Sequence, residues 1–202
     1  MRATLWFCAI LSVASLSAGA RMTVSVCTEG RPAELPRLRA QAVASSVYRM
    51  VNVEIAWAKC EDAPVGEEAA RQHWYTIRLC GDPLMGSPGL LSLDTLGEAF
   101  LSEDGPGYLA EVYYNSAGEL ASRARVDSGT LLGYVMAHEI GHLLLGPGHA
   151  PEGVMRASWK SYDFDLIRMG RMKFHSEEGA RIRQALETEP PKKLVVVTAV
   201  SR

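Results

Sequence analysis

Several runs in the first half of the chain alternate between apolar and polar residues, which is the period of a half-buried strand. The first, Met22–Cys27, is also rich in residues that favour strands and predicts one near the N-terminus. Stretches that are polar or rich in Gly and Pro separate it from later runs. Four of these later runs also predict strands: Val51–Ala58, His73–Cys80, Leu96–Leu101 and Gly107–Tyr114.

Apolar residues at helical spacing predict three helices. One is expected over Pro32–Met50 and another over Ser176–Thr188. The third begins at Asp127 or Ser128, either of which can cap its first turn. The last apolar run, Leu194–Val200, is either a late strand or a disordered tail.

The third helix is apolar around most of its circumference, which is typical of a helix that is buried on all sides. Gly133 and Gly141 lower its helix propensity. We therefore expect these two small residues to serve packing, by letting the helix approach the sheet closely.

Composition limits the size of the domain and the kinds of partner that we expect. The chain has 202 residues, of which 48% are hydrophobic and 22% charged, with a formal net charge of −2. This length suits one globular domain with a substantial core. The near-neutral balance gives no reason to expect nucleic acid or an anionic membrane as a partner.

The extreme N-terminus has the layout of a secretory signal peptide. Arg2 precedes an apolar run over Leu5–Leu16, and Ala18-Gly19-Ala20 offers a small-residue cleavage site. We expect residues 1–20 to be removed, a secreted or periplasmic location, and no stable membrane association after cleavage. The alternative is an uncleaved membrane anchor.

Three cysteines remain after such a cleavage: Cys27, Cys60 and Cys80. In an exported protein, one pair can form a disulfide and one thiol is left over. Each lies at the C-terminal end of a strand-like run, so the sequence leaves all three pairings open.

Candidate chemistry is concentrated in one stretch of the buried helix. His138, Glu139 and His142 form H-E-x-x-H, and positions i and i+4 lie on the same helical face, so both imidazoles can reach one metal ion. Gly146 can end the helix in a positive-φ conformation. His149 beyond that turn can supply a third nitrogen. Glu139 lies about 100° round the helix from His138, beside the ion rather than on it.

Three protein ligands leave a fourth position for water, which is the arrangement of catalytic rather than structural zinc (Zn²⁺). The alternative is that two histidines and an unrelated glutamate share a buried helix by coincidence. The third histidine after a glycine turn favours a metal site over coincidence.

The stretch resembles the signature of the metzincin zinc peptidases, H-E-x-x-H-x-x-G-x-x-H, with one additional residue before Gly146. One additional residue rotates the helix exit by about 100°, so the backbone after the helix has to rearrange locally for the imidazole of His149 to point at the metal. Downstream, Ala150–Met155 is similar to a Met-turn at the short spacing of the matrixin branch. The resemblance implies that Met155 lies beneath the metal and that Tyr162 is a candidate for contacting the metal or the oxyanion.

The resemblance also implies a fold: an α+β (α/β-like) domain over residues 21–190, followed by a tail over 191–202. Its sheet is mixed and has about five strands, with a buried active-site helix and a C-terminal helical subdomain. By strand order, Gly97–Leu101 is the antiparallel edge strand above the active cleft. An exposed edge can hold an extended peptide by strand addition.

We therefore expect a zinc endopeptidase in which Glu139 is the general base and the substrate is a peptide or protein. A gluzincin-like site with Glu177 or Glu178 as third ligand is one alternative. A non-catalytic, zinc-stabilised binding module on the same fold is another. A matrixin-type blocking cysteine has no counterpart between Arg21 and the first strand.

Overall fold

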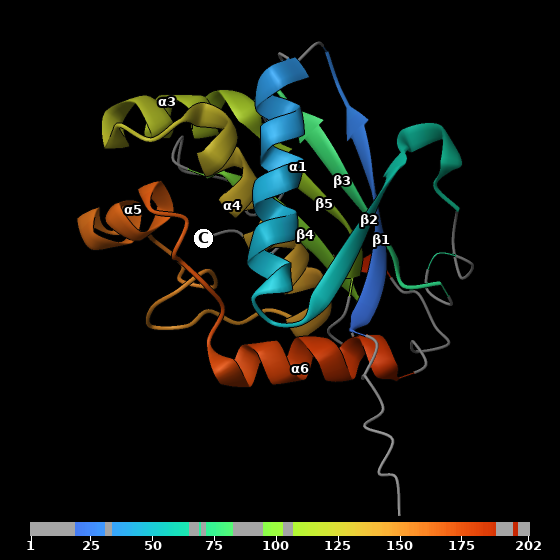
Figure 1. Cartoon of the computed structure of the whole chain (residues 1–202). Helices are drawn as coiled ribbons and strands as arrows, with labels where there is room; N and C mark the ends of the chain where they lie inside the picture. Colours follow the sequence, from blue (N-terminus) through green and yellow to red (C-terminus); the bar gives the residue numbers. More distant parts are fainter. Residues whose placement is uncertain are drawn as a thin grey trace, which may run out of the picture.

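A six-stranded mixed sheet forms the centre of the computed structural model, in the order β2-β1-β3-β5-β4-β6 (Figure 1). β1, β2, β3 and β5 are parallel, whereas β4 runs antiparallel to β5 and to β6. The structure describes residues 19–30, 34–64, 69, 72–82, 95–102, 107–188 and 196–197. The strands are β1 (Ala20–Thr28), β2 (Val53–Lys59), β3 (Trp74–Cys80), β4 (Gly97–Ser102), β5 (Gly107–Tyr113) and β6 (Val196–Val197).

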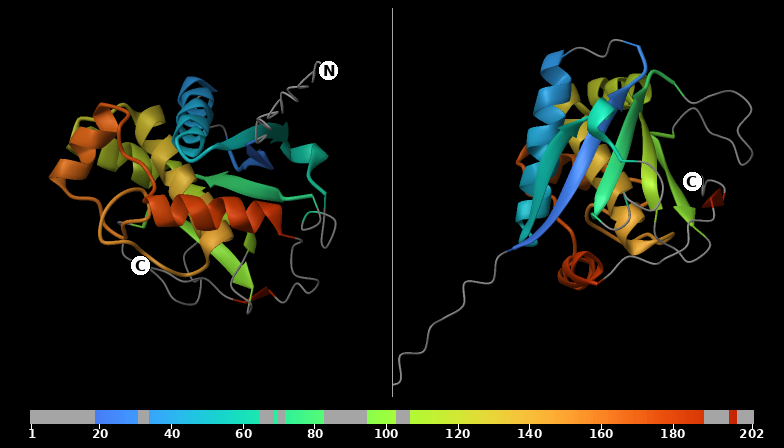
Figure 2. Two further views of the ribbon diagram at one scale, coloured as in Figure 1. Left: turned by 60° about the horizontal axis from the view of Figure 1, so that its bottom comes forward. Right: turned by 90° about the vertical axis from the view of Figure 1, so that its right-hand side faces the viewer.

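Helices α1 and α4 lie against each other on one face of the sheet, and α6 crosses beneath the strands (Figure 2). α3 and α5 lie beyond α4, on the side away from β2 (Figure 1). The bounds are α1 (Glu34–Arg49), the 3₁₀ turn η1 (Cys60–Asp62), α3 (Tyr114–Ala124), α4 (Ser128–Leu145), α5 (Ser161–Arg168) and α6 (Ser176–Glu187). None of the helices described here is both long and apolar enough to cross a bilayer.

The core lies between the sheet and helices α1 and α4. Val24, Ile77 and Ala110 sit at the centres of β1, β3 and β5 and are fully buried. α4 is buried along nearly its whole length, as its apolar circumference predicted. The predicted fold class is confirmed. The sheet is mainly parallel, with an antiparallel strand next to β5. One helix is buried, and the C-terminal part of the chain is helical.

α4 makes its closest approach to α1, and this corrects the expectation that its glycines serve packing on the sheet. A Cβ at Gly133 would lie 2.6 Å from Val43 Cβ and 2.7 Å from the backbone oxygen of Ala40. A Cβ at Gly141 would lie 2.4 Å from the sulfur of Met155. These glycines therefore admit a neighbouring helix and a methionine side chain.

The disulfide joins Cys27 to Cys60, and Cys80 is a buried free thiol. The bond links the end of β1 to the turn that follows β2, where the two strands lie side by side in parallel register. Sequence left three pairings open, and the adjacency of β1 and β2 selects this one.

Two short helices, α3 and α5, were missed in the sequence. α3 has 11 residues, and its buried residues are Ala117 and Ala121. α5 is a helix of 8 residues whose buried positions are Asp163 and Ile167. Short helices that are held by tertiary contacts lack the long amphipathic pattern on which sequence interpretation depends.

The predicted antiparallel edge strand is present as β4, and a short sixth strand pairs with one end of it. β4 was predicted to be the edge strand, yet Val196 and Val197 of β6 pair antiparallel with Ser102 and Leu101. β6 covers only this end of β4, which is the end away from Gly97. The rest of the predicted tail and residues 1–18 of the predicted signal peptide lie outside the described residues.

Candidate metal centre

Helix α4 begins where the sequence places it and carries two of the candidate ligands. Asp127 is the N-cap, and its carboxylate accepts hydrogen bonds from the backbone N–H of Thr130 at 2.8 Å and from its hydroxyl at 2.9 Å. Arg39 of α1 also pairs with Asp127 at 2.7 Å, so the cap holds the two helices together. The cap thus sets where α4 begins, and the i, i+4 spacing places His138 and His142 on one face of it.

The end of α4 returns the chain toward these two histidines. Gly146 has φ 83°, and its N–H donates to the carbonyl of His142 at 2.9 Å. Such a positive φ is unfavourable for residues with a Cβ, so glycine suits this turn. The helix extends as far as Leu145, and the turn that follows accommodates the one-residue insertion and brings His149 back.

Three imidazoles meet at this turn. One nitrogen each from His138, His142 and His149 lies within 4.8 Å of the other two. The ring centroids are 4.7 Å apart for His138 and His142, 4.8 Å for His142 and His149, and 5.4 Å for His138 and His149. They form the single such cluster of potential metal ligands among the described residues.

Two backbone carbonyls orient the histidines of α4. Nδ1 of His138 donates to the carbonyl of Val154 at 2.7 Å, and Nδ1 of His142 donates to that of Gly146 at 3.1 Å. Since a carbonyl can only accept, each ring carries its proton on Nδ1 and directs an unprotonated Nε2 inward. This is the usual outer-shell arrangement of metal-binding histidines.

The two Nε2 atoms face each other at a distance of 3.0 Å. Burial lowers the pKa of His138 to about 3, aided by the neighbouring His142, and it also lowers the pKa values of His142 and His149. All three rings are therefore neutral near pH 7 and present lone pairs. Two inward lone pairs at this distance repel unless a cation lies between them. Two nitrogens on one tetrahedral zinc ion are about 3.3 Å apart, so the His138–His142 pair has a spacing that suits zinc. The nitrogen of His149, within 4.8 Å of the other two, would move closer on binding.

Glu139 is buried beside the cluster, with 6% of its surface exposed. Its side chain packs on the start of β4, because a Cβ at Gly97 would lie 2.8 Å from both Cγ and Oε1 of the glutamate. Burial raises the pKa of Glu139 to about 8, and the nearby carboxylate of Glu98 adds to the shift. Without a cation this group favours its neutral form, and a cation at the histidines would oppose that preference.

Met155 is fully buried and packs against α4 at Gly141, the residue before His142. The predicted Met-turn segment doubles back here: the N–H of Ala150 donates to the carbonyl of Met155 at 2.8 Å. The segment continues to Trp159, whose ring meets that of His138 edge-on at 6.1 Å between centroids. An apolar floor and an aromatic wall thus support the histidine cluster.

Other candidates lie away from the cluster. Tyr162 is in α5, is 66% exposed, and lines a different surface depression beside Asn52 and Glu152. Glu177 is exposed, and the carboxylate of Glu178 accepts the backbone N–H of His175 at 2.7 Å at the start of α6. Neither glutamate joins the ligand cluster found among the described residues.

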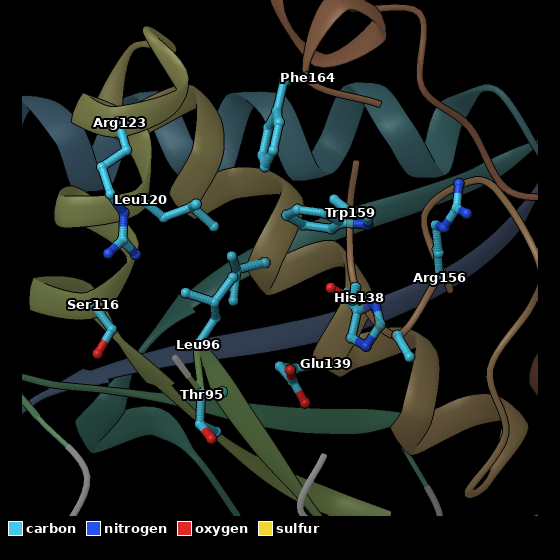
Figure 3. A pocket seen from close by; sticks show the side chains of 14 residues that line it. Thr95, Leu96, Ser116, Leu120, Arg123, His138, Glu139, Arg156, Trp159 and Phe164 are labelled. Carbon is cyan, nitrogen blue, oxygen red and sulfur yellow. The ribbon is translucent and has the colours of Figure 1, made fainter. Parts of the chain in front are cut away.

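A cavity of about 290 Å³ opens beside His138 and Glu139 (Figure 3). Its walls come from the start of β4, α3, α4, the segment after Met155, and α5; we call it the α3 cavity. Its lining includes Leu96, Ser116, Leu120, Arg123, Trp159 and Phe164. His149 lies on the other side of the cluster and lines a separate hollow with Glu178 and Arg181.

Sequence reasoning missed several of these residues. The carbonyls of Val154 and Gly146 are backbone atoms, which leave no trace in a residue pattern. Gly97 follows Leu96 at the predicted strand, but nothing in the chain shows that it faces Glu139. Arg123 lies in a helix that was not predicted.

Comparisons with known proteins support the fold. No protein-family profile and no curated protein sequence matches the chain. Among solved structures, archaemetzincin from Methanopyrus kandleri matches with a TM-score of 0.50 and 19% identity, over 86% of this chain and 99% of that one. Metalloproteinase-II from Bacteroides fragilis matches with a TM-score of 0.50 and 15% identity, over 85% of this chain and 54% of that one.

At these identities the likeness concerns the fold. This chain has a metzincin-like fold and carries a three-histidine cluster on it. It spans about half the length of the Bacteroides protein. The two comparisons do not single out the matrixin branch, so that finer resemblance stays a prediction.

Proposed function

We propose that this protein is a zinc-dependent peptidase that hydrolyses internal peptide bonds. The observation that carries the proposal is a cluster of three neutral imidazoles beside a buried carboxylate, of which His138 and Glu139 line the α3 cavity. The metzincin-like fold supports the same reading.

The roles of the chain's own groups follow from their geometry. His138, His142 and His149 would hold the metal through ring nitrogens, two of them oriented by the carbonyls of Val154 and Gly146. When bound, zinc supplies Lewis-acid chemistry by acidifying water and polarising a carbonyl. The carboxylate of Glu139 accepts a proton from the attacking water and later returns it to the leaving amine.

Binding of the substrate backbone falls to β4 in this proposal. The residues from Gly97 to Phe100 pair with β5 on one side. On the other side, the strand pairing seen among the described residues is that of β6 with Leu101 and Ser102. An extended peptide can add along the remaining edge by main-chain hydrogen bonds. Gly97 would bring the scissile bond close to Glu139, because no side chain separates the strand from that carboxylate.

Glu139→Gln tests the catalytic assignment. The substitution keeps the side-chain size and leaves all three histidines in place, so zinc content by mass spectrometry should stay at the wild-type level. Turnover of a proteome-derived peptide mixture should fall by about 10²–10⁴-fold, the usual contribution of a general base. Unchanged turnover would refute the role of Glu139.

The wild-type protein in the same screen tests the activity itself. A protein that binds zinc yet cleaves nothing across the peptide mixture would instead be a zinc-stabilised binding module. Cleavage that depends on added zinc and disappears with a chelator supports the peptidase.

We also propose that the protein is exported. The N-terminal pattern over residues 1–20 supports export, and so does the Cys27–Cys60 disulfide, because such bonds persist in oxidising compartments. β1 begins at Ala20, next to the proposed mature start at Arg21. N-terminal sequencing of protein recovered from the periplasm or medium should begin near Arg21, and recovery from the cytosol alone would contradict export.

A further inference from the structure

Helix α6 crosses below the carboxyl ends of α1 and α4 (Figure 1). Its buried residues Gly179, Ile182 and Leu186 follow the spacing i, i+3, i+7 and so share one face of the helix. This face packs closely, because a Cβ at Gly179 would lie 2.7 Å from Cγ1 of Val51. Its packing therefore fixes the rotation of α6 about its own axis and the directions in which the other side chains leave it.

Two arginines leave α6 on opposite sides of this buried face. Arg181 precedes Ile182 and Arg183 follows it, so each lies about 100° round the helix from it, in opposite directions. Arg181 donates to the backbone carbonyl of Leu145 at 3.0 Å, and Arg183 donates to that of Val51 at 2.9 Å. Leu145 is the last residue of α4, and Val51 follows the end of α1. The two bonds are alike in kind, and the bond to Leu145 adjoins the histidine cluster.

The peptide group between Leu145 and Gly146 is held at both of its polar atoms. Its N–H donates to the carbonyl of His142 at 2.9 Å. Its carbonyl is one of the last four of α4, which the N–H groups of the helix itself leave unsatisfied, and Arg181 supplies a donor to it. A positive charge at this end also suits the helix dipole. Arg181 thus helps to fix the plane of the peptide from which the turn departs.

Two of the three imidazoles depend on how that peptide is oriented. The carbonyl of Gly146 accepts from Nδ1 of His142 at 3.1 Å and from the N–H of Gly148 at 3.0 Å, in the turn that brings His149 back. Gly146 has φ 83°, but glycine also adopts negative φ readily, so its own conformation does not hold the turn. Rotation of the Leu145–Gly146 peptide would move the carbonyl away from the ring of His142 and redirect the chain that carries His149.

We propose that Arg181 is a positioning residue of the metal centre, which aims His142 and His149 by holding the carbonyl of Leu145. This inference rests on the zinc site of the function proposed above. Arg181 also lines the hollow that contains His149. A guanidinium so close to a metal site repels the cation, so charge alone predicts that Arg181 weakens zinc binding. Positioning predicts that it strengthens zinc binding, and the sign of a mutational effect therefore tells the two apart.

The first test measures the zinc affinity of the full chain by competition with a chromogenic chelator. Arg181→Gln should bind zinc about 3- to 10-fold more weakly than the wild type, which is the range of one hydrogen bond that water can reach. Arg181→Lys keeps the charge and a long side chain with a donor at its tip, so it should recover part of the loss. Unchanged or tighter zinc binding by Arg181→Gln would overturn the proposal.

Arg183→Gln is the matched control. It removes the same charge from the same helix, together with the same kind of bond to a backbone carbonyl, but this carbonyl lies beyond the end of α1. Its zinc affinity should stay within about twofold of the wild-type value. Circular dichroism and thermal melting check that α6 stays folded in both variants. Equal weakening of zinc binding in the two variants would show a general loss of α6 packing and would overturn the proposal.

A second test observes the ring of His142 in the metal-free protein. Its Nδ1 proton is hydrogen-bonded to the carbonyl of Gly146 and should exchange slowly with solvent. Nuclear magnetic resonance of histidine labelled with ¹⁵N measures that exchange. The rate should rise about 3- to 10-fold in Arg181→Gln and stay at the wild-type value in Arg183→Gln. A role confined to the stability of α6 would leave the rate unchanged at temperatures where both variants are folded.

These readouts separate the inference from the peptidase proposal. Cleavage by the wild type together with equal zinc affinity in Arg181→Gln rejects the positioning role and leaves the peptidase standing. Absence of cleavage by the zinc-loaded wild type, together with weaker zinc binding in Arg181→Gln alone, rejects the peptidase and keeps the positioning role. A wild type that binds no zinc rejects the proposed function, and the exchange rate of the His142 ring proton then decides whether Arg181 positions that ring.

Discussion

Glu139 shows most clearly how position sets chemistry at the scale of one residue. Its carboxyl is buried against Gly97, close to a second carboxylate at Glu98, and its pKa rises to about 8 mainly through burial. A buried carboxyl with a strongly raised pKa is typical of a functional site. A metal cation at the histidines would favour its ionised form.

This shift predicts how stability depends on pH in the metal-free protein. The folded-state pKa lies above the unfolded value of 4.5, so the group's contribution is complete below about pH 4.5 and is lost as pH rises through 8. Glu139→Gln removes that loss. The variant should match the wild type in urea unfolding at pH 4.5 and exceed it at pH 8.5, by at most about 5 kcal/mol.

The comparison of the two proteins isolates this one group. Burial lowers the pKa values of the three histidines, so their contribution is lost as pH falls below about 6.5, but this trend is common to both proteins. The contribution of the histidines therefore cancels when the free energies of unfolding of the two proteins are subtracted. A difference that does not grow between pH 4.5 and pH 8.5 would show that Glu139 is solvated or paired in the folded state.

At the scale of elements, α4 combines three tasks in one helix. Its buried circumference fills the core, its glycines admit α1 and Met155, and one face carries His138 and His142. The cap at Asp127 and the turn at Gly146 determine where the helix begins and ends. A shift in its packing therefore moves the ligands as well as the core.

Two glycine substitutions test the role of close packing. Gly133→Ala places a Cβ 2.7 Å from the backbone oxygen of Ala40 and 2.6 Å from Val43 Cβ, so α1 and α4 have to separate. We expect the free energy of unfolding to fall by about 1–3 kcal/mol. Chemical denaturation with fluorescence detection measures it.

Gly118→Ala is the control, since it makes the same change inside a helix. Nothing lies within 4 Å of a Cβ at Gly118 in α3. There the higher helix propensity of Ala should raise stability by up to about 1 kcal/mol. Equal effects at the two positions would show that propensity, and not the approach of α1, determines the result at Gly133.

At the scale of the whole molecule, the sheet brings distant segments to one place. β4 runs antiparallel to β5, so its first residue, Gly97, lies beside Val112 near the carboxyl end of β5. α4 crosses behind this edge and the segment after Met155 closes it from the other side. Residues from 95 to 164 thus build one site, although the candidate metal ligands span only 138 to 149.

Zinc should stabilise the whole domain through this site. At about a thousandfold excess over Kd, binding adds about 4 kcal/mol, which corresponds to a rise in Tm of about 10 °C for a chain of this size. His149→Ala should lose most of this rise, whereas Glu178→Gln should retain it. The opposite result would favour the gluzincin-like ligand set, in which a downstream glutamate replaces His149.

The sequence by itself determined the local parts of this protein. The periodicity of apolar residues was enough to predict the long strands and helices α1, α4 and α6, because a buried face repeats at the period of its element. The spacing of His138, Glu139 and His142 was enough for their shared side of α4. Asp127 or Ser128 as the N-cap, and Gly146 as the end, were recognised because capping depends on neighbouring residues alone.

Tertiary structure decided what depends on residues far apart in the chain. The partner of Cys27 followed from the adjacency of β1 and β2, and the exposed position of Tyr162 followed from where α5 lies. α3 is a helix of 11 residues that was identified only in the structure, where it packs on α4. The contact of Gly97 with Glu139, and the place of Arg123 across the cavity, exist only once the sheet has assembled, because they join elements that no local interaction connects.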